Sequence, residues 1–468
     1  MDTVIGVDVA RRTTHQAVVV RGGRVERARK VRPSAEALDA LVAAAGPGAT
    51  VVLEPTALAW VPLCAWLTYR GCRVIRVDTK KAHEFRKFVA RDAKSDRIDA
   101  EALARMPLAA PDALHEAPRL ERRHFALQRL VRLRAALVED RAAVHNRLLS
   151  AVEGVGQAYA EALGRGTLSV AKRALLRSHL HPGRVAELDV EALGAAIPDL
   201  EPGLASAWCA AAREAWSIWG PLEAAGRCPI DFDLAQVEVD VGLDRLAELD
   251  AHVARVEGRI ASAAQELSEV EALRSVPGIG PTIAPTIAAT IGDIRRFPNA
   301  RSFVRWLGLN PRKNQTGIAD RSGQTLSKAG DRMLRRYLHI AAQVGRQIDP
   351  GLAAIYDRHM RKGGHHNHAT TVVAHALARR IYALLVRAAH DQTSRYLLRD
   401  PQQRILDRAA ARAWTRQHYP SKRERDRAST VVKNGATRRF HQTTGHEVAV
   451  PTPSDTDTES AQPEVAMT

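Results

Sequence analysis

The sequence has few cysteines, few aromatic residues and no long apolar run, and each shortage excludes a class of protein. Four cysteines occur among 468 residues, with no CxxC pair and no spacing typical of a zinc site. No stretch approaches the roughly 18 apolar residues that a membrane-spanning helix needs, and no charged-then-apolar leader opens the chain. We therefore expect a soluble, cytoplasmic protein with reduced thiols and no membrane partner.

Acidic residues are also scarce relative to basic ones. Lys and Arg number 69 against 52 Asp and Glu, which gives a net charge of +17 and a pI near 10.2. An excess of this size favours a polyanionic partner, and nucleic acid is the usual one. A solvated basic surface, or a genome that prefers Arg codons, would produce the same composition.

The N-terminal segment has the pattern of a mixed α/β domain. Short β-branched runs alternate there with helical periodicity. Strands are predicted at 3–10, 16–20, 24–31, 50–54 and 73–77. Helices are predicted at 34–45 and 57–70, with a helical pattern from 81 to 106. The order βββαβαβα supports the α/β class on its own, and the specific RNase H-like fold is what a family resemblance implies.

The rest of the chain has the pattern of an all-α protein. Apolar residues at helical spacing in 118–150 and 243–268 predict two coiled-coil-like helices, which could pair within one chain or between two protomers. Residues 155–235 are Ala-rich and helical in character but contain no motif. We expect an α/β domain at 1–115, a helical region at 116–270 with an insertion at 155–235, a helical domain at 271–390, and a basic then acidic tail at 391–468, largely disordered.

Four carboxylates lie on the predicted strands and helix of the N-terminal domain, in an order that is typical of a metal site. Asp8 lies inside the first strand, Glu54 ends the strand run TVVLE, and Asp96 and Asp99 share a helix face in KSDRIDAEALA. If they converge, like charges so close require a divalent cation, and hard oxygen ligands suit Mg²⁺ or Mn²⁺. Taken singly, each has an ordinary alternative, such as a strand edge, a solvated helix position, or a helix N-cap at Asp96 in competition with Ser95.

Several segments resemble one known family. GVDVA, LEPT and KSDRIDAEALA in the first half, and SVPGIGPTIAPTIAATIGD and FVRWLGLNPRKNQTGIADRSGQTLSKAGDRMLRRYLHIAA in the second, look like the DEDD-type transposases of insertion-sequence family one-ten. The resemblance covers about 1–150 and 240–390. It implies a RuvC-like N-terminal domain, a C-terminal transposase domain, and DNA strand cleavage and rejoining at the ends of an insertion sequence. It also implies a structured non-coding (bridge) RNA partner and a homo-oligomer, dimer or tetramer, with a composite active site.

The resemblance also assigns roles in the second half. The segment 275–281 looks like the hairpin of a helix-hairpin-helix, where Gly278 and Gly280 would let the backbone approach phosphates, although a tight αα-hairpin without DNA contact is equally compatible. The family places a nucleophilic serine in a Ser-Gly pair after GLxP, and Thr316 stands at that position here. The candidate phosphate-binding residues are Lys313, Arg321, Lys328 and Arg332.

Two other functions remain open on the sequence. A Mg²⁺-dependent nuclease of the junction-resolvase kind would use the carboxylates with water as nucleophile and would not need Thr316. A catalytically inactive nucleic-acid-binding derivative is the other, and the threonine in place of serine is its best support. Cleavage without a covalent adduct would favour the first, and binding without cleavage would favour the second.

Overall fold

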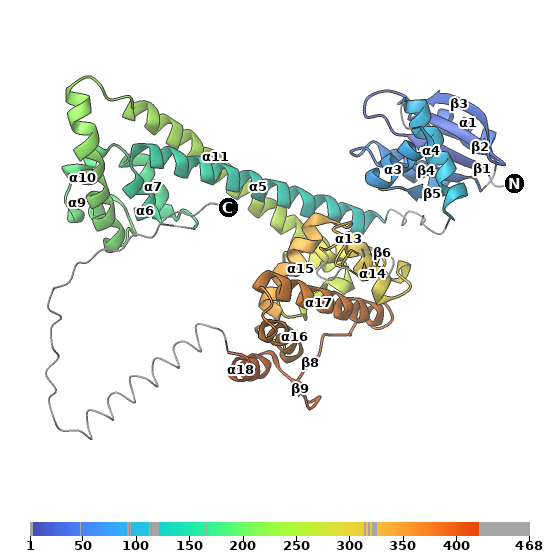
Figure 1. Ribbon diagram of the computed structural model, residues 1–468. Helices are drawn as coiled ribbons and strands as arrows, with labels where there is room; N and C mark the ends of the chain where they lie inside the picture. The colour runs from blue at the N-terminus through green and yellow to red at the C-terminus, as the bar shows by residue number, and fades with distance from the viewer. Residues whose placement is uncertain are drawn as a thin grey trace, which may run out of the picture. The chain divides into compact units, whose positions relative to one another are not determined.

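In the computed structural model, a β-sheet domain comes first, and the described residues after it form mainly helices with a few two-residue strands (Figure 1). The described residues are 3–46, 48–90, 93, 95–111, 114, 121–164, 166–312, 315–316, 319–320 and 325–420. Two compact units are present. The first combines 1–341 with 374–396, and the second combines 342–373 with 397 onward.

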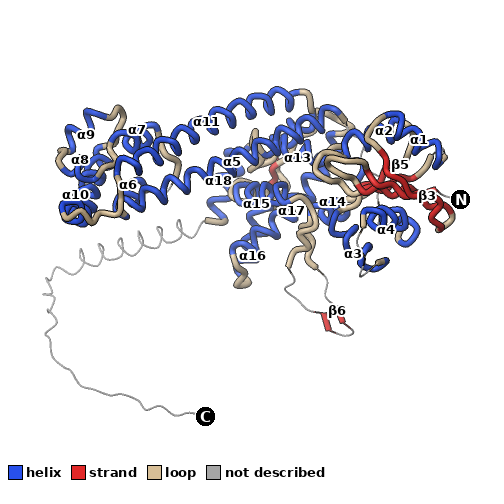
Figure 2. The backbone as a smooth tube through the Cα atoms, turned by 90° about the horizontal axis from the view of Figure 1, so that it is seen from above, coloured by secondary structure: helices blue, strands red, loops and turns tan. Residues whose placement is uncertain are grey.

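The N-terminal domain is built on a five-stranded mixed sheet, red in Figure 2. Its strands are β1 (Thr3–Asp8), β2 (His15–Arg21), β3 (Arg24–Val31), β4 (Thr50–Leu53) and β5 (Arg73–Arg76). Their spatial order is β3-β2-β1-β4-β5, with β1, β2 and β3 antiparallel and β4 and β5 parallel to β1. This arrangement confirms the α/β class and is compatible with the RNase H-like domain that the family resemblance implies.

Helices cover both faces of this sheet, because its central strands are apolar on both sides. Ile5 and Val7 contribute to a core with α1 (Ala35–Ala45) and α2 (Trp60–Tyr69). Val4 contributes to a second core with α3 (Thr79–Val89) and α4 (Asp96–Ala109) on the other face. Burial on both faces is the expected state of a continuous apolar run such as β1.

One glycine lets α4 lie directly on β1. A Cβ atom on Gly6 would lie 1.9 Å from the carbonyl oxygen of Ala100 and 2.5 Å from the backbone nitrogen of Ala104. Farther along α4, Arg105 Nη1 donates to the carbonyl of Gly23, in the β2–β3 turn, at 3.4 Å. That turn lies at the end of the sheet where β1 begins. The first turn of α4 therefore lies toward the end of β1, where Asp8 is.

Two long helices, α5 (Arg122–Val155) and α11 (Phe232–Gln265), lie side by side and antiparallel (Figures 1 and 2). The α11 residues of the predicted seam, from Leu246 to Ile260, are buried. Three ion pairs fix the register: Arg123–Glu266 at 3.3 Å, Arg134–Glu257 at 2.7 Å and Arg141–Asp250 at 3.2 Å. The two helices thus pair within one chain, the first of the two pairings that the sequence left open, although Leu133 of the predicted α5 seam is 49% exposed.

The insertion between these helices has a core of its own. It comprises α6 (Gln157–Leu163), α7 (Val170–Ser178), α8 (Pro182–Ala186), α9 (Val190–Ala196) and α10 (Pro202–Ala224). Tyr159 and Trp208 are fully buried at its centre, with ring centroids 4.2 Å apart in an edge-to-face contact. Trp208 donates to the carbonyl of His179 at 2.8 Å. The core continues onto α5 and α11, so the insertion is a folded cap on the helical pair.

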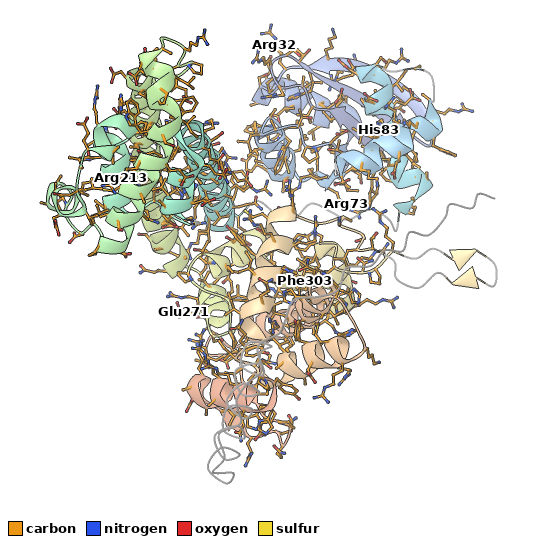
Figure 3. The ribbon with its side chains drawn as sticks, turned by 60° about the vertical axis from the view of Figure 1, so that its left-hand side comes forward. Arg32, Arg73, His83, Arg213, Glu271 and Phe303 are labelled. Carbon is orange, nitrogen blue, oxygen red and sulfur yellow. The ribbon has the colours of Figure 1, made fainter. Side chains whose placement is uncertain are left out.

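After α11 the chain folds around an aromatic cluster. The elements in this region are α12 (Ser268–Arg274), α13 (Ile283–Ile291), the 3-10 helix η2 (Ile294–Arg296), α14 (Ala300–Leu307), α15 (Arg332–Gly345) and α17 (His366–Ala388). Phe303, labelled in Figure 3, is 1% exposed, and its ring centroid lies 5.2 Å from that of Phe297 and 5.8 Å from that of Tyr382. Tyr382 also donates to the carbonyl of Phe297 at 3.0 Å.

The second unit contains α16 (Pro350–Arg361), which lies within the helical domain predicted at 271–390. It also contains three elements where the sequence predicts a tail: β8 (Leu398–Arg399), β9 (Ile405–Leu406) and α18 (Arg408–His418). Thr415 of α18 is buried and donates to the carbonyl of Ile348 at 3.0 Å, and Ala411 is buried one turn earlier. The prediction that 391–468 is largely disordered is therefore wrong for 391–420, because the many Arg residues of α18 mask a short apolar face. Residues 421–468 lie outside the described part of the chain.

Among the described residues, only α17 has the length and apolar composition to cross a membrane. Half of its most apolar 18-residue window is buried inside the protein. Val373, Leu377 and Ile381 are completely inaccessible to solvent. This burial is what the core helix of a globular fold requires, so apolar composition alone does not distinguish the two cases.

We predict that Gly6→Ala displaces α4 from the sheet. The added methyl group would overlap backbone atoms that cannot rotate away, and overpacking of this kind costs about 1–3 kcal/mol or more. Hydrogen–deuterium exchange should become faster in the α4 amides. Gly154→Ala is the matched control, because its Cβ would meet nothing within 4 Å and alanine favours a helix. Unchanged exchange in the Gly6 variant would contradict the proposed close packing.

Candidate functional site

Two of the predicted carboxylates follow neighbouring parallel strands. Val7 of β1 is paired with Leu53 of β4, and Asp8 and Glu54 are the residues that come next. Gly6 faces α4, and side chains alternate along a strand, so Asp8 lies on the α4 side of the sheet. Asp8 and Glu54 are both half-buried. Parallel strands end at the same edge, which makes these two carboxylates neighbours.

The other two carboxylates lie in the first turn of α4. The side chain of Ser95 accepts a hydrogen bond from Ile98 N at 3.3 Å, so Ser95 is the N-cap and Asp96 is not. Asp96 is exposed, and Asp99 is one-quarter exposed. Carboxylates in a first turn are stabilised by the helix dipole. Because this turn lies toward the end of β1, all four carboxylates share one edge of the domain.

The charge at this edge is compensated from within the protein. Arg86 of α3 lies with its Nε 3.0 Å from Asp99 Oδ1. Within the described residues, Glu54 and Asp96 make no hydrogen bond or ion pair, and no three His, Cys, Asp or Glu side chains come close enough together to hold a metal ion. The donors are all hard oxygens, which suit Mg²⁺ or Mn²⁺, but Asp99 is engaged by an arginine in this conformation.

Thr316 lies in a two-stranded ribbon between α14 and α15. Strands β6 (Gln315–Thr316) and β7 (Ala319–Asp320) are antiparallel, with Thr316 opposite Ala319. Below them the stem is held by a bridge and two backbone hydrogen bonds: Pro311 with Leu326, Arg312 N to Thr325 O at 2.9 Å, and Ser327 N to Asn310 O at 2.9 Å. The backbone thus places Thr316 near the tip of the ribbon, and its side chain lies outside the described part of the structure.

Two glycines close the base of this ribbon. Gly308 ends α14 in the left-handed conformation, with φ +72°, and a Cβ there would lie 2.7 Å from Ala329 N. A Cβ on Gly330 would lie 2.3 Å from the carbonyl oxygen of Trp306. Both contacts are between backbone atoms, so neither position accommodates a side chain without movement. The GLNP and KAGD segments therefore fix where the ribbon leaves the helical domain.

Two of the four predicted phosphate-binding residues lie at or just after the base of the ribbon. Lys328 is exposed at its base, and Arg332 is exposed in the first turn of α15. Lys313 and Arg321 lie outside the described residues. Ser327, a nearby hydroxyl, donates to Asn310 Oδ1 at 3.0 Å and is part of the stem.

The segment 275–281 joins two short helices, α12 and α13, in a tight turn. Gly278 has φ +87°, which favours glycine, and Ile279 N donates to the carbonyl of Val276 at 3.0 Å. No atom lies within 4 Å of a Cβ built on Gly280, so its backbone faces open space. The structure shows two short helices joined by a turn, and both the helix-hairpin-helix motif and its DNA contact stay predictions.

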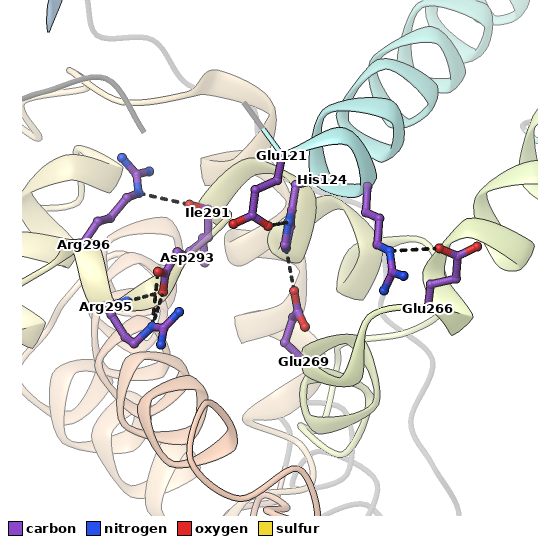
Figure 4. A network of polar contacts seen from close by, with 9 residues as sticks. Glu121, His124, Glu266, Glu269, Ile291, Asp293, Arg295 and Arg296 are labelled. Atoms are coloured by element: carbon purple, nitrogen blue, oxygen red, sulfur yellow. Dashed lines mark hydrogen bonds and ion pairs between the residues drawn. The ribbon is translucent and has the colours of Figure 1, made fainter. Parts of the chain in front are cut away.

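A polar network ties this hairpin to the start of α5 (Figure 4). His124 lies between two carboxylates, with Nε2 2.7 Å from Glu269 Oε1 and Nδ1 3.0 Å from Glu121 Oε2. The hydrogen bond to Glu269, followed by the smaller effect of Glu121, raises the pKa of His124 above its usual value although burial opposes it. A protonated imidazole can donate to both carboxylates at once. His124 therefore fastens α12 to α5.

Basic side chains gather where α13 ends. Arg296 Nε donates to the carbonyl of Ile291 at 3.1 Å (Figure 4). Its guanidinium lies 4.3 Å from the ring centroid of Phe297 and 4.7 Å from that of Trp306. Arg295 pairs with Asp293 at 2.9 Å. Ring faces attract a cation, and Arg296, which is exposed, adds positive charge at this point.

Comparison with known families identifies both halves of this architecture. A model described as Transposase, of the IS110 DEDD type, matches residues 5–156, which are the sheet domain and α5. A second model, described as the IS116/IS110/IS902 transposase family, matches residues 270–357, from α12 into α16. The chain belongs to the IS110 family of DEDD transposases. The cap on the helical pair lies between the two matched regions of this IS110-family chain.

Two curated relatives are similar to shorter stretches. A probable family 20 transposase of Pseudomonas aeruginosa is 39% identical over 95 residues, which are 20% of this chain and 28% of that protein. An uncharacterized 43.6 kDa protein of insertion element IS110 from Streptomyces coelicolor is 28% identical over 113 residues, 24% of this chain and 28% of that protein. The IS110-family chain thus aligns with little more than a quarter of either relative.

Sequence reasoning missed two residues that organise these sites. In the sequence pattern, Arg86 does not differ from the other basic residues of α3. In the structure it pairs with Asp99, which is thirteen residues later in the chain. His124 begins a long basic helix, and its partner Glu269 is 145 residues away. No local signal identifies either partnership, because each depends on which helices pack together.

We predict that His124→Gln removes a pH-dependent part of the stability. A pKa raised by folding means that the folded state holds the proton more tightly, so the contribution is present below the unfolded-chain value of about 6.5. It is lost as pH rises through the higher folded-state pKa. Urea midpoints measured from pH 6 to 9 should therefore fall more in the wild type than in the variant. His252→Gln, which removes an imidazole 4.0 Å from Glu248, should leave the wild-type slope, and equal slopes for all three proteins would contradict the assignment.

Proposed function

We propose that this protein cleaves and rejoins DNA strands at the ends of an insertion sequence. The observation that carries the proposal is the placement of Asp8, Glu54, Asp96 and Asp99 at one edge of the sheet domain, in a chain that two transposase family models match. A phosphodiester is an anion, so a carboxylate edge can act on it only when a cation intervenes. The excess of basic residues over acidic ones agrees with a nucleic-acid substrate.

The four carboxylates would hold one or two Mg²⁺ or Mn²⁺ ions. Bound there, the metal supplies the charge that activates a nucleophile and stabilises the leaving oxygen of the phosphodiester. The chain's own contribution is positional. The strand ends fix Asp8 and Glu54, and the Ser95 cap fixes the turn that carries Asp96 and Asp99. Arg86 must give up Asp99 before that carboxylate can serve as a ligand.

The nucleophile in this proposal is the hydroxyl of Thr316. Its attack on phosphorus forms a transient threonyl–DNA phosphoester and breaks the bond to the leaving strand oxygen. Rejoining reverses the step on a second strand. The ribbon supports the assignment, because its glycine-closed base and paired stem hold the backbone of Thr316 near the tip. A composite site would bring the ribbon to the carboxylates of another protomer in a dimer or tetramer.

A structured non-coding RNA that bridges donor and target DNA is the finer part of the proposal. Lys328 and Arg332, at the base of the ribbon and in the first turn of α15, are exposed cations. Such side chains are suited to backbone phosphates of either nucleic acid. Gly278 and Gly280 would bring the hairpin backbone close to a phosphate. Localisation to the cytoplasm, at the nucleoid, follows from the DNA substrate.

We expect Asp96→Asn to abolish Mg²⁺-dependent strand cleavage while the fold is retained. Asp96 is exposed and makes no polar contact with described residues, so the substitution removes a charge and little structure. Cleavage of an element-end substrate and the circular-dichroism melt are the two measurements. Glu36→Gln is the control, since Glu36 is an exposed carboxylate in the first turn of α1 on the opposite face of the sheet. Full cleavage by the Asp96 variant would refute the carboxylate assignment.

For Thr316 we expect a graded response to substitution. Thr316→Ser should match or exceed the wild type, because it keeps the hydroxyl and removes the methyl that crowds in-line attack. Thr316→Val should be inactive. Suicide DNA substrates, followed by peptide mapping, should reveal a covalent adduct at Thr316. An adduct at Ser322 or Ser327 would rule out Thr316 and assign the attack to that serine. Activity in Thr316→Val without a covalent adduct would favour water.

A further inference from the structure

The contact between α3 and α4 contains an ion pair that conflicts with the proposed role of Asp99. Arg86 Nε lies 3.0 Å from Asp99 Oδ1, and the arginine side chain is only 13% exposed. Arg86 Nη2 lies 3.0 Å from His83 Nδ1 on the preceding turn of α3. Arg86 is thus held between its own helix and a carboxylate that is expected to bind metal.

This pair is held by charge and proximity, with poor hydrogen-bond alignment. Asp99 Oδ1 is buried, and it accepts no hydrogen bond from any described residue even though Arg86 Nε is near. An aligned, bidentate arginine–carboxylate pair is the strong form of this interaction. The observed form is weaker, so a competing cation can replace the guanidinium at Oδ1.

The same guanidinium is a good ligand for a backbone phosphate. Arginine matches phosphate geometry with two parallel N–H donors, and Arg86 can present such a pair once it gives up its contacts with Asp99 and with His83 Nδ1. Lys80, Lys81 and Lys87 on α3 are exposed, and they add positive charge along the helix that carries Arg86. A nucleic-acid strand that approaches the carboxylate edge therefore offers Arg86 a better anion than the one it holds.

We infer that Arg86 couples nucleic-acid binding to metal binding. In the free protein Arg86 neutralises Asp99 in place of a metal ion. When a strand arrives, Arg86 transfers to a phosphate, and Asp99 becomes available as a metal ligand. This inference rests on the proposed function in one respect only, which is that the four carboxylates form the metal site. Arg86 is a positioning residue in this scheme, because it acts through Asp99.

The coupling must be reciprocal. If nucleic acid raises the metal affinity by some factor, then metal raises the nucleic-acid affinity by the same factor. A factor on the order of tenfold is within the range that coupled sites usually show. The free protein would then bind metal weakly away from DNA, and an unproductive metal-loaded state would be rare.

The experiment measures Mn²⁺ binding to the full-length protein by electron paramagnetic resonance, without nucleic acid, with a DNA duplex, and with a single-stranded RNA. In the wild type, Mn²⁺ affinity should rise about tenfold with whichever nucleic acid engages Arg86. Arg86→Gln should bind Mn²⁺ more tightly than the wild type without nucleic acid, and it should lose the enhancement. Its melting temperature should also rise more on Mn²⁺ addition, because the metal then compensates an unpaired Asp99.

Arg97→Gln is the matched control. Arg97 is exposed in the first turn of α4 and makes no polar contact with described residues, so the variant removes one positive charge from the same edge without freeing Asp99. It should keep the wild-type enhancement. Arg86→Lys tests whether the guanidinium matters beyond its charge, and the enhancement should be reduced.

The outcomes separate this inference from the proposed function. If Asp96→Asn abolishes Mn²⁺ binding while Arg86→Gln binds Mn²⁺ like the wild type and keeps the enhancement, the coupling role of Arg86 is overturned and the metal site stands. If Asp96→Asn and Asp99→Asn both leave Mn²⁺ binding unchanged, the carboxylate site itself fails, and the coupling fails with it. Equal enhancement in Arg86→Gln and Arg97→Gln would also overturn the coupling.

Discussion

The absence of a side chain at Gly6 decides how the candidate site is assembled. Because Gly6 has no Cβ atom, the backbone of α4 lies directly on β1, with its first turn toward Asp8. Asp8 and Glu54 need no such device, because the pairing of β1 with β4 already places them side by side. Half of the carboxylate set therefore depends on sheet register, and the other half depends on one helix–strand contact.

The sequence predicts features that depend on a local repeat of apolar residues or on a residue's position within one helix or strand. The strands of the sheet, the two long helices and the carboxylates at strand ends all follow from periodicity and position. Arg86 could not be assigned, because its partner Asp99 is a neighbour only after α3 and α4 pack on the same face. His124 and Glu269 are still more distant in sequence. The helix α18 was missed because its buried residues, Ala411 and Thr415, are small and surrounded by arginines.

Charge is used in two different ways in this protein. On α5 and α11, ion pairs such as Arg134–Glu257 and Arg141–Asp250 are partly exposed, and each contributes little to stability on its own while fixing the register. At the carboxylate edge, Arg86 and Asp99 are more enclosed, so each charge requires a partner. The first kind of pair marks the register of two helices. The second kind is the one that, in the proposed coupling, exchanges its partner when a metal ion and a nucleic acid bind.

The antiparallel pair of α5 and α11 also constrains how relatives of this protein can diverge. A residue inserted in one helix moves every ion pair beyond it out of alignment, unless the other helix gains a residue at the same level. Lengthening is therefore tolerated chiefly as matched additions of whole heptads, each of which would move the cap outward by about 10 Å at 1.5 Å per residue. The distance between the cap and the far end of the helical pair can thus change during evolution in steps of one heptad. The folded parts at either end need not change.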